Sequence, residues 1–360
     1  MDLLKHGSLL AGRYRIGKRL GAGGTSEVYL ADAAEGNGQP ARQVAVKVLR
    51  PDRALSSESV ARFQREARVV SQLRHPNLLE VFDFGEDQGR WYLVMERLEG
   101  IELTEAIELK GTYDLDEAAS ILDAVLSALD STHSYGLVHR DVKPSNIFLA
   151  RTVAGEILVK LVDFGIVQEV ASGNVHLTET GFLVGTPGYV SPEQARGATI
   201  DARSDLYSLG CVMFEMLAGR PPYINPSPIK LLQEHVFAPV PSPRDFKLDL
   251  KYADQADAFL ARALAKSPGD RYSSAEEMRT ALAKMVASLG GPHESAPITL
   301  PPNSIGHSFG DNSPHLRHAS RRATAKVAKA IESSKPPFVR LAMVAAASAI
   351  LAAGLMHFLR

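Results

Sequence analysis

The sequence contains 360 residues, of which 45% are hydrophobic and 22% are charged. This composition is that of an ordinary globular protein, and it excludes a wholly disordered chain, a fibrous chain and a protein with many membrane spans. The net charge of −1 gives no overall positive field to attract nucleic acid, and the single cysteine, Cys211, excludes a disulfide scaffold.

The first part of the chain is rich in short β-prone runs, separated by Gly-rich or polar turns. One helix interrupts them, because apolar residues recur at helical spacing between residues 54 and 73. The turn His75-Pro76-Asn77 ends this helix. The predicted strands cover residues 14–20, 27–31, 44–49, 78–84 and 91–95.

Beyond Gly100 the pattern changes from strands to helices. The change predicts an α+β fold with two lobes, whose boundary lies at residues 97–100. Cys211 lies in the helical part and is expected to be a small buried thiol. The predicted helices cover residues 115–135, 205–218, 253–265 and 275–289.

The periodic pattern ends near Gly290. Residues 290–340 carry 7 Lys and Arg against 3 Asp and Glu, and their prolines and polar residues predict a basic linker. Residues 341–359 are 19 residues without a charged side chain. As a helix they would extend about 28 Å, close to the bilayer core of about 30 Å, so a single membrane span is predicted. A buried terminal helix is the alternative, which the long linker before it disfavours.

Two motifs in the strand-rich part carry chemistry. The turn between Leu20 and Val28 is rich in glycine, which would let backbone N–H groups approach phosphates without obstruction by Cβ atoms. Lys47 ends an alternating apolar run, and Glu66 lies on the following helix. This carboxylate would offset the cost of burying the lysine.

Two further motifs lie in the helical part. In HRDVKPSN, residues 139–146, Asp141 supplies a proton acceptor, Lys143 a cation that can face phosphate, and Asn146 an amide that can face a metal ion. The motif DFG begins at Asp163, directly after a strand predicted at residues 157–162. A carboxylate in this place can bind magnesium, which prefers oxygen ligands.

With these motifs in this order, the chain resembles the eukaryotic-type (Hanks-type) Ser/Thr protein kinases that occur in bacteria. The segment GTPGYVSPE, residues 185–193, looks like the end of a kinase activation segment, with Ser191 where alanine is usual. Ser26 is a second departure, because it stands in place of the third glycine of the family's loop. The resemblance implies an N-terminal arm at 1–13, a kinase domain at 14–285 with an N-lobe at 14–97 and a C-lobe at 98–285, a linker at 286–340 and a transmembrane helix at 341–359.

The resemblance implies that the chain binds ATP together with Mg²⁺, or Mn²⁺ as an alternative. Asp141 would accept the proton of the substrate hydroxyl, and Lys143 would neutralise the γ-phosphate. Asn146 and Asp163 would hold the metal ion. The implied ATP-binding residues are Leu20, Gly21, Ala22, Gly23, Gly24, Thr25, Ser26, Val28, Ala45, Lys47, Glu66, Met95, Glu96, Leu98 and Phe148, with Glu66 holding Lys47 and with the backbone of Glu96 and Leu98 on the adenine edge.

The resemblance also implies structural supports and a modification site. Asp205 would brace the loop at 139–146 through backbone hydrogen bonds, and Glu193 and Arg271 would form a buried ion pair. Autophosphorylation is expected at Thr178 or Thr180, because Arg140 could pair with a phosphate and order the segment.

The expected partners are protein substrates with Ser or Thr hydroxyls, and no nucleic acid. Basic residues before residue 341 predict that the kinase domain is cytoplasmic and that anionic lipids bind the linker. The chain is thus expected in the cell (inner) membrane as a single-pass protein. A second copy of the chain is a further candidate partner, through the kinase domain or the transmembrane helix.

Two alternatives remain at this point. A pseudokinase, which would be a binding module on the same fold, would be favoured by the loss of a motif residue, but all of them are present. A small-molecule kinase of related fold is disfavoured by the segment that ends at Glu193, since in protein kinases this segment builds a platform for a protein substrate.

Overall fold

The computed structural model describes residues 2–22, 26–34, 42–50, 57–163, 187–246, 253–288, 297–301, 304 and 307–308. All of them belong to the first of two compact units, Met1–Asp311. The second unit, Asn312–Arg360, lies outside the described residues, and with it the predicted membrane span. No helix among the described residues is both long and apolar enough to cross a membrane.

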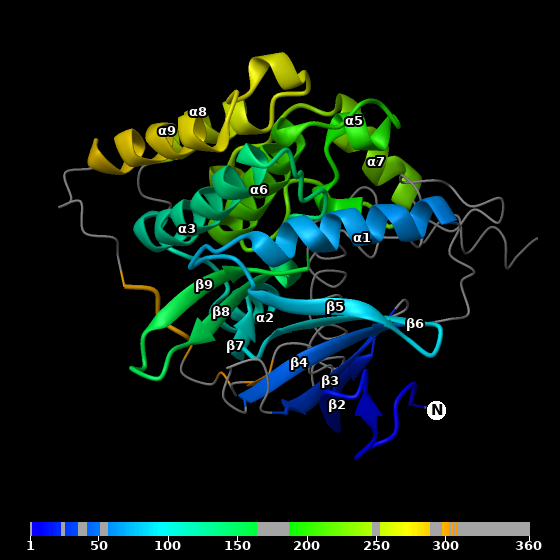
Figure 1. Cartoon of the computed structure of the whole chain (residues 1–360). Coiled ribbons are helices and arrows are strands. Elements are labelled where there is room, and N and C mark those ends of the chain that lie inside the picture. Colours follow the sequence, from blue (N-terminus) through cyan, green and yellow to red (C-terminus); the bar gives the residue numbers. More distant parts are fainter. Residues whose placement is uncertain are drawn as a thin grey trace, which may run out of the picture. The chain divides into compact units, whose positions relative to one another are not determined.

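An antiparallel sheet of six strands forms the N-lobe (Figure 1). Four of its strands follow the predicted runs closely, while the first pairs the N-terminal arm with the sheet. The strands, in spatial order, are β1 (Leu9–Leu10), β2 (Tyr14–Ala22), β3 (Ser26–Ala33), β4 (Arg42–Leu49), β6 (Arg90–Glu96) and β5 (Val81–Asp87).

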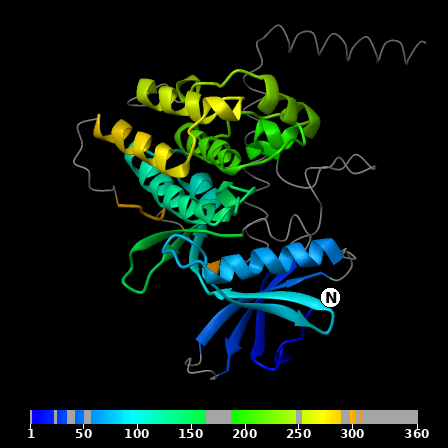
Figure 2. The same cartoon turned by 45° about the horizontal axis from the view of Figure 1, so that its top comes forward.

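The two faces of this sheet bury different sets of side chains, as the alternation of a β-strand requires. Tyr29 and Val46 belong to an outer cluster that includes residues of the N-terminal arm. Val28 and Ala45 belong to an inner cluster that extends into the C-lobe. Helix α1 (Ser57–Gln72) lies between the sheet and the helical lobe (Figures 1 and 2).

The C-lobe is built around two buried helices, α3 (Leu115–Ser134) and α6 (Ala202–Ala218). Asp201 caps the start of α6, and its side chain accepts a hydrogen bond from the Arg203 N–H. The helix is capped at its end by Gly219, whose φ of 71° lies in the left-handed region that favours glycine. The other helices are α2 (Leu103–Lys110), α5 (Pro192–Ala195), α7 (Pro228–Phe237), α8 (Ala253–Ala263) and α9 (Ala275–Ala287).

A second antiparallel sheet lies where the two lobes meet, and its strands were not all predicted. Its order is β10-β7-β8-β9, with bounds Glu99–Glu102 for β7, Ile147–Arg151 for β8 and Ile157–Leu161 for β9. Gly100 in β7 allows a close approach, because a Cβ atom there would lie 2.0 Å from the carbonyl oxygen of Leu149. Position 100, in the hinge segment that connects the lobes after β6, is thus restricted to glycine.

Part of the predicted linker is ordered on this sheet. Strand β10 (His307–Ser308) pairs with β7, and the Thr299 N–H donates to Glu117 on α3 at 3.5 Å. Ile298 and Leu300 pack against the C-lobe core. The prolines and polar residues of this region predicted a linker. The apolar stretch around Ile298 and Leu300 is too short to show the periodicity that would have indicated packing against a lobe.

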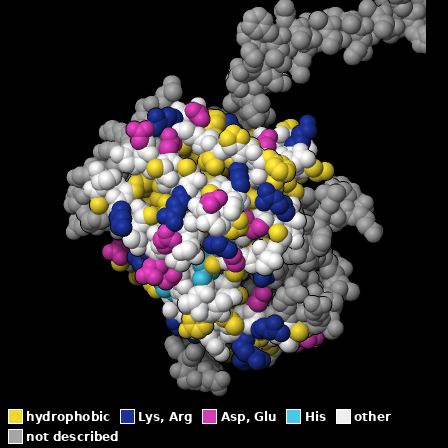
Figure 3. All heavy atoms as spheres, turned by 90° about the horizontal axis from the view of Figure 1, so that it is seen from above, with side chains coloured by type: hydrophobic (Ala, Val, Ile, Leu, Met, Phe, Trp, Pro, Cys, Tyr) yellow, Lys and Arg dark blue, Asp and Glu magenta, His cyan; other side chains and the backbone are white. Residues whose placement is uncertain are grey.

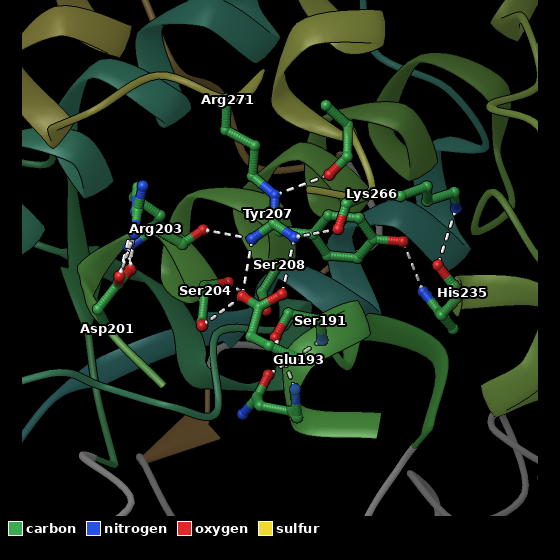
Figure 4. Close-up of polar contacts among 12 residues, drawn as sticks. Ser191, Glu193, Asp201, Arg203, Ser204, Tyr207, Ser208, His235, Lys266 and Arg271 are labelled. Atoms are coloured by element: carbon green, nitrogen blue, oxygen red, sulfur yellow. Dashed lines mark hydrogen bonds and ion pairs between the residues drawn. The ribbon is translucent and has the colours of Figure 1, made fainter. Parts of the chain in front are cut away.

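The predicted ion pair between Glu193 and Arg271 is confirmed (Figure 4). The guanidinium donates to both carboxylate oxygens at 2.7 Å, and the Ser204 hydroxyl donates to one of them at 2.5 Å. The side chain of Arg271 is 0% exposed and that of Glu193 6%. Since both charges are buried, each depends on the other for compensation.

Ser191 and Cys211 have clear structural roles. The Ser191 hydroxyl caps α5 by accepting from the Gln194 N–H, and the Gln194 side chain accepts from the Ser191 N–H. The unusual serine of the activation-segment motif therefore stabilises the first turn of this helix. Cys211 is a fully buried thiol, as predicted, and burial raises its pKa.

The face of the C-lobe seen in Figure 3 carries basic and acidic side chains that are interspersed rather than segregated. Ion pairs on this lobe include Arg262 with Glu277 and Arg279 with Asp123. Such an arrangement gives this face no strong field of one sign.

Replacement of Arg271 should show how much the Glu193–Arg271 pair contributes to the free energy of unfolding. Arg271→Leu leaves the carboxylate of Glu193 buried without its partner, so we expect the free energy of unfolding to fall by about 3–5 kcal/mol. Arg279→Leu removes a half-exposed pair with Asp123 and should cost below about 1 kcal/mol. Urea unfolding of both variants measures the difference, and equal losses would contradict this account.

Candidate active site

The loop at residues 139–146 is held by one carboxylate, that of Asp205 on α6. Its Oδ2 accepts from the His139 N–H at 2.8 Å and its Oδ1 from the Arg140 N–H at 2.7 Å. A third contact, at 2.8 Å, joins Oδ2 to Nε2 of His133 on α3. The predicted bracing role of Asp205 is therefore confirmed. Arg140 has a φ of 66°, an uncommon value for a residue with a side chain, and the two backbone bonds hold it there.

His139 joins this loop to the end of strand β9. The ring is fully buried, and burial lowers its pKa, so the imidazole is neutral. Its Nε2 lies 3.1 Å from the carbonyl oxygen of Val162, and its Nδ1 accepts from the Asp141 N–H at 3.4 Å. These partners assign the proton to Nε2. The loop and the strand end that carries Asp163 are thereby fixed to one another.

The side chains of Lys143 and Asn146 each lie within hydrogen-bonding distance of the Asp141 side chain. The Lys143 ammonium lies 2.9 and 2.7 Å from the two carboxylate oxygens of Asp141. The Asn146 amide donates to Oδ2 and to the backbone carbonyl of Asp141, at 2.8 and 2.7 Å. Because the amide nitrogen is used in these two bonds, the carbonyl oxygen of the Asn146 side chain is the atom left to face a ligand.

Lys47 and Asp163 meet across the space between the lobes. The Lys47 ammonium lies 2.5 Å from Oδ1 of Asp163, although the two residues are 116 positions apart in the chain. Asp163 has a φ of 54°, so this residue, like Arg140, is held in the left-handed region. Among the contacts between described residues, the carboxylate that Lys47 reaches is Asp163. The predicted contact with Glu66 stays a prediction.

Six of the predicted ATP-binding residues share one buried apolar cluster between the lobes. Each is at most 8% exposed, and the cluster also includes Leu79, Ala150 and Val162. The six come from β2, β3, β4, β6, the segment after β6, and β8: Leu20, Val28, Ala45, Met95, Leu98 and Phe148. The structure therefore gathers side chains from segments that are far apart in the sequence into one apolar cluster, named the slot for the adenine ring that the kinase resemblance would place against it.

The remaining predicted site residues are distributed as follows. Gly21 and Ala22 end β2, Ser26 begins β3, and Glu96 ends β6. Glu66 is half-buried on α1. Gly23, Gly24 and Thr25 and the proposed modification sites Thr178 and Thr180 lie outside the described residues.

The structure adds residues that motif spacing did not single out. Lys160 on β9 donates to Glu96 Oε1 at 2.6 Å and to the Leu78 carbonyl at 3.0 Å. The Asn77 amide donates to the Val159 carbonyl at 2.9 Å. The hinge, the turn after α1 and β9 are therefore joined by buried polar contacts. A lysine three positions before Asp163 was the available signal, since burial of its charge requires a partner.

Glu102, at the end of β7, is a second addition. Burial, the nearby carboxylate of Asp163 and that of Glu105 raise its pKa to about 7, whereas Lys143 opposes this shift. The site thus holds a carboxyl group that is partly protonated at neutral pH beside two fixed charges. No sequence motif pointed to Glu102, because the shift depends on burial and on Asp163 and Lys143, which lie in other segments of the chain.

Glu102 should make the stability of the protein dependent on pH. A raised pKa means that its contribution is present below pH 4.5 and is lost progressively as pH rises to about 7. Compared with Glu102→Gln, the wild type should therefore lose about 1–2 kcal/mol of unfolding free energy between pH 5 and 7. Urea unfolding at both pH values tests this, with Glu102→Asp as the variant that keeps a carboxyl group. A difference between wild type and Glu102→Gln that does not change with pH would refute the assignment.

Curated proteins of similar sequence are serine/threonine-protein kinases. The serine/threonine-protein kinase PknB of Mycolicibacterium smegmatis is 42% identical over 284 residues, which are 77% of this chain and 43% of that protein. PknB of Mycobacterium tuberculosis is 41% identical over 282 residues, 77% of this chain and 44% of that protein. The chain thus aligns with less than half the length of these curated relatives.

A solved kinase structure has a fold similar to that of this chain. The crystal structure of the PknI kinase domain of Mycobacterium tuberculosis covers 79% of this chain and 100% of its own, with a TM-score of 0.62 and 32% identity. Residues 14–283 match the family described as "Protein kinase domain". The predicted kinase fold, with a β-rich N-lobe and a helical C-lobe, is confirmed, and the chain belongs to the protein kinase family.

Proposed function

We propose that the chain is a serine/threonine protein kinase that transfers the γ-phosphoryl group of ATP to hydroxyl groups of proteins. The observation that carries this proposal is the convergence of Lys47, Asp141, Asn146 and Asp163 beside the apolar slot. These residues provide a cation, a proton acceptor and oxygen ligands at one place between the lobes. Phosphoryl transfer needs positioning and charge neutralisation more than it needs covalent chemistry.

The slot and Lys47 account for nucleotide binding. Adenine would lie among the apolar side chains of the slot, with its polar edge on the backbone of Glu96 and Leu98. The Lys47 ammonium, which lies 2.5 Å from Asp163 Oδ1, would contact the α- and β-phosphates. The glycine-rich turn between β2 and β3 would cover the phosphates.

Two side chains fit a divalent metal ion. Asp163 has one carboxylate oxygen on Lys47, and Asn146 has its amide nitrogen on Asp141, so each retains an oxygen for a ligand. Mg²⁺ at nucleotide sites uses one or two protein oxygens together with phosphates and water, and Mn²⁺ is the alternative. When bound, the ion would neutralise charge on the phosphates.

Asp141 and Lys143 would act on the transferred group. Asp141 would accept the hydroxyl proton of the substrate and orient its oxygen for attack. Lys143, held 2.7 Å from Asp141, would place a positive charge near the γ-phosphate, where charge develops during transfer. The positions of both depend on Asn146 and on the bracing by Asp205.

The alternatives fit this geometry less well. A pseudokinase would not require the acid, the amide and the two charged partners to converge at hydrogen-bonding distances. The position of α5 argues against a small-molecule kinase. Gln194 on this helix donates a hydrogen bond of 2.9 Å to the Arg140 carbonyl in the loop at 139–146. This contact supports a platform for a protein substrate directly beside Asp141.

Asp141→Asn should separate these possibilities. Loss of the proton acceptor should lower the rate of protein phosphorylation by about 10²–10⁴-fold while leaving ATP binding and the unfolding temperature near those of the wild type. Asp254→Asn changes a side chain that is 89% exposed and should retain full activity. Radiolabel transfer to a generic protein acceptor measures the rate, and wild-type rates in a folded Asp141→Asn protein would reject the proposal.

We further propose that activation involves autophosphorylation at Thr178 or Thr180. What supports this is the sequence, in which both threonines fall between DFG and the segment that ends at Glu193, and the position of Arg140 beside Asp141. A phosphate in this segment would pair with a cation and order the chain around it.

Mass spectrometry after incubation with ATP tests the modification. We expect phosphate on Thr178 or Thr180 and a several-fold lower activity in a Thr178→Ala/Thr180→Ala double variant, because the cation then has no phosphate to pair with. Ser172, in the same segment, is the weaker candidate, so Ser172→Ala should lower the activity less than the double variant does. A fully active enzyme with this segment unmodified would contradict the hypothesis.

We also propose, from the sequence, that residues 341–359 attach the chain to a membrane. It is supported by the length of this uncharged stretch and by the seven basic residues between residues 317 and 340. The basic residues would keep the kinase domain on the cytoplasmic side and attract anionic lipids. A second copy of the chain could pack against the small residues of the span and promote phosphorylation in trans.

Truncation after Ser334 tests the anchor. The shortened protein should move from the membrane fraction to the soluble fraction, because it lacks the apolar stretch, and its autophosphorylation should become dependent on concentration. The full chain with Ala349→Leu, which keeps the stretch apolar, should remain with membranes. Continued partition of the truncated protein with membranes would show that another part of the chain is the anchor.

A further inference from the structure

The N-terminal arm, residues 2–10, is packed on the outer face of the N-lobe sheet. Leu4 is 8% exposed and Leu10 3%, and both belong to the cluster that contains Tyr29 on β3. Strand β1 at the end of the arm pairs with β2, where Leu10 lies opposite Tyr14. The arm is thus a covering layer of this lobe and not a free tail.

Beneath the arm lies a fully buried carboxylate, that of Glu27. Its side chain is 0% exposed, and Oε2 accepts from the Leu3 N–H at 3.0 Å and from the Tyr29 hydroxyl. Arg50 at the end of β4 lies 2.7 Å from Oε1. Although burial by itself would raise the pKa of Glu27, the bonds from Leu3 and Tyr29 and the charge of Arg50 hold that pKa below its usual range.

Two backbone N–H groups of the arm help to stabilise the Glu27 carboxylate. Leu3 donates to Glu27 directly, and Leu4 donates its N–H to the Tyr29 hydroxyl at 3.1 Å, which sets that hydroxyl to donate to Glu27. Asp2 pairs with Arg19 on β2 at 2.5 Å, and Arg19 also lies 4.0 Å from Glu27. A buried charge that loses one partner is strongly destabilised, so the arm and the strands are coupled through it.

The position of Glu27 connects this network to the ATP site. In the register of β2 and β3, Glu27 lies opposite Ala22, and its neighbour Val28 lies opposite Gly21. Successive side chains of a strand point to opposite faces. Glu27 is therefore bonded to the arm on the outer face, while Val28 lines the apolar slot on the inner face. Both stand at the base of the glycine-rich turn.

We propose that Glu27 is a positioning residue for ATP binding, which the arm residues Asp2–Leu4 hold in place so that the paired ends of β2 and β3, at Gly21, Ala22 and Val28, keep the position that ATP binding requires. This inference rests on the proposed kinase function for its steady-state readout. Glu27 touches no substrate and acts through the strand that carries Val28. The N-terminal arm is accordingly part of the nucleotide site in function, although it lies on the opposite face of the sheet.

Steady-state kinetics of the full chain test the proposal, with ATP and a generic protein acceptor varied separately. Glu27→Gln and Tyr29→Phe should each raise the KM for ATP at least fivefold, with kcat and the KM for the acceptor within twofold of wild type. Leu4→Asp should also raise the KM for ATP. Leu4→Met keeps an apolar side chain at this position and should have the wild-type KM for ATP. Glu156→Gln changes an exposed glutamate in the turn after β8 and is the matched control.

Calorimetric titration with ATP gives a readout that does not need turnover. The Kd for ATP should rise by the same factor as the KM in Glu27→Gln and Tyr29→Phe. If the wild type binds ATP but phosphorylates no protein, the proposed function fails while this inference is still decided by the Kd values. An unchanged Kd in folded Tyr29→Phe and Leu4→Asp would overturn the inference, as would a loss of kcat at constant KM. These two variants decide the matter if Glu27→Gln does not fold.

Discussion

The geometry of the active site depends first on the burial of Asp205. This carboxylate accepts two backbone N–H groups of the loop that carries Asp141, and it reaches His133 on α3 as well. Bonds from N–H groups to a buried carboxylate are strong because the surroundings have a low dielectric constant. They hold Arg140 in a left-handed conformation that an isolated loop would leave. The direction of Asp141 is therefore set by a residue 64 positions further along the chain.

A second set of buried contacts determines how the N-lobe meets the C-lobe. The Leu161 N–H donates to the Asn77 carbonyl at 2.8 Å, and Leu79 donates back to Leu161 at 3.0 Å. Lys160 adds an ion pair with Glu96 in the hinge. Since β9 leads directly to Asp163, these contacts link the position of Asp163 to the segment after α1 and to Glu96. The Lys47–Asp163 pair adds a contact between β4 and the residues after β9.

Charge is distributed unevenly around this space. Lys47 and Lys143 each have a carboxylate partner, whereas Glu102 lies near carboxylates and tends to keep its proton. Nucleotide phosphates would bring further negative charge, and the two lysines and a divalent cation would balance it. Glu27 provides a contrast, because its charge is buried but satisfied by a fixed set of donors. One carboxylate is thus suited to respond to ligands and the other to hold the framework.

The sequence by itself determined the family and the two lobes and indicated the candidate site residues, because these depend on local patterns. The strands of the N-lobe follow from alternation and turn residues, and the motifs at Asp141 and Asp163 have fixed spacing whatever surrounds them. Tertiary structure alone decided the raised pKa of Glu102, the Lys160–Glu96 pair and the docking of the N-terminal arm on Glu27. Each of these depends on groups from segments far apart in the chain, whose distance and burial are set only when the chain has packed. Local periodicity contains no information about such contacts, since it describes a face of one element and not its neighbours.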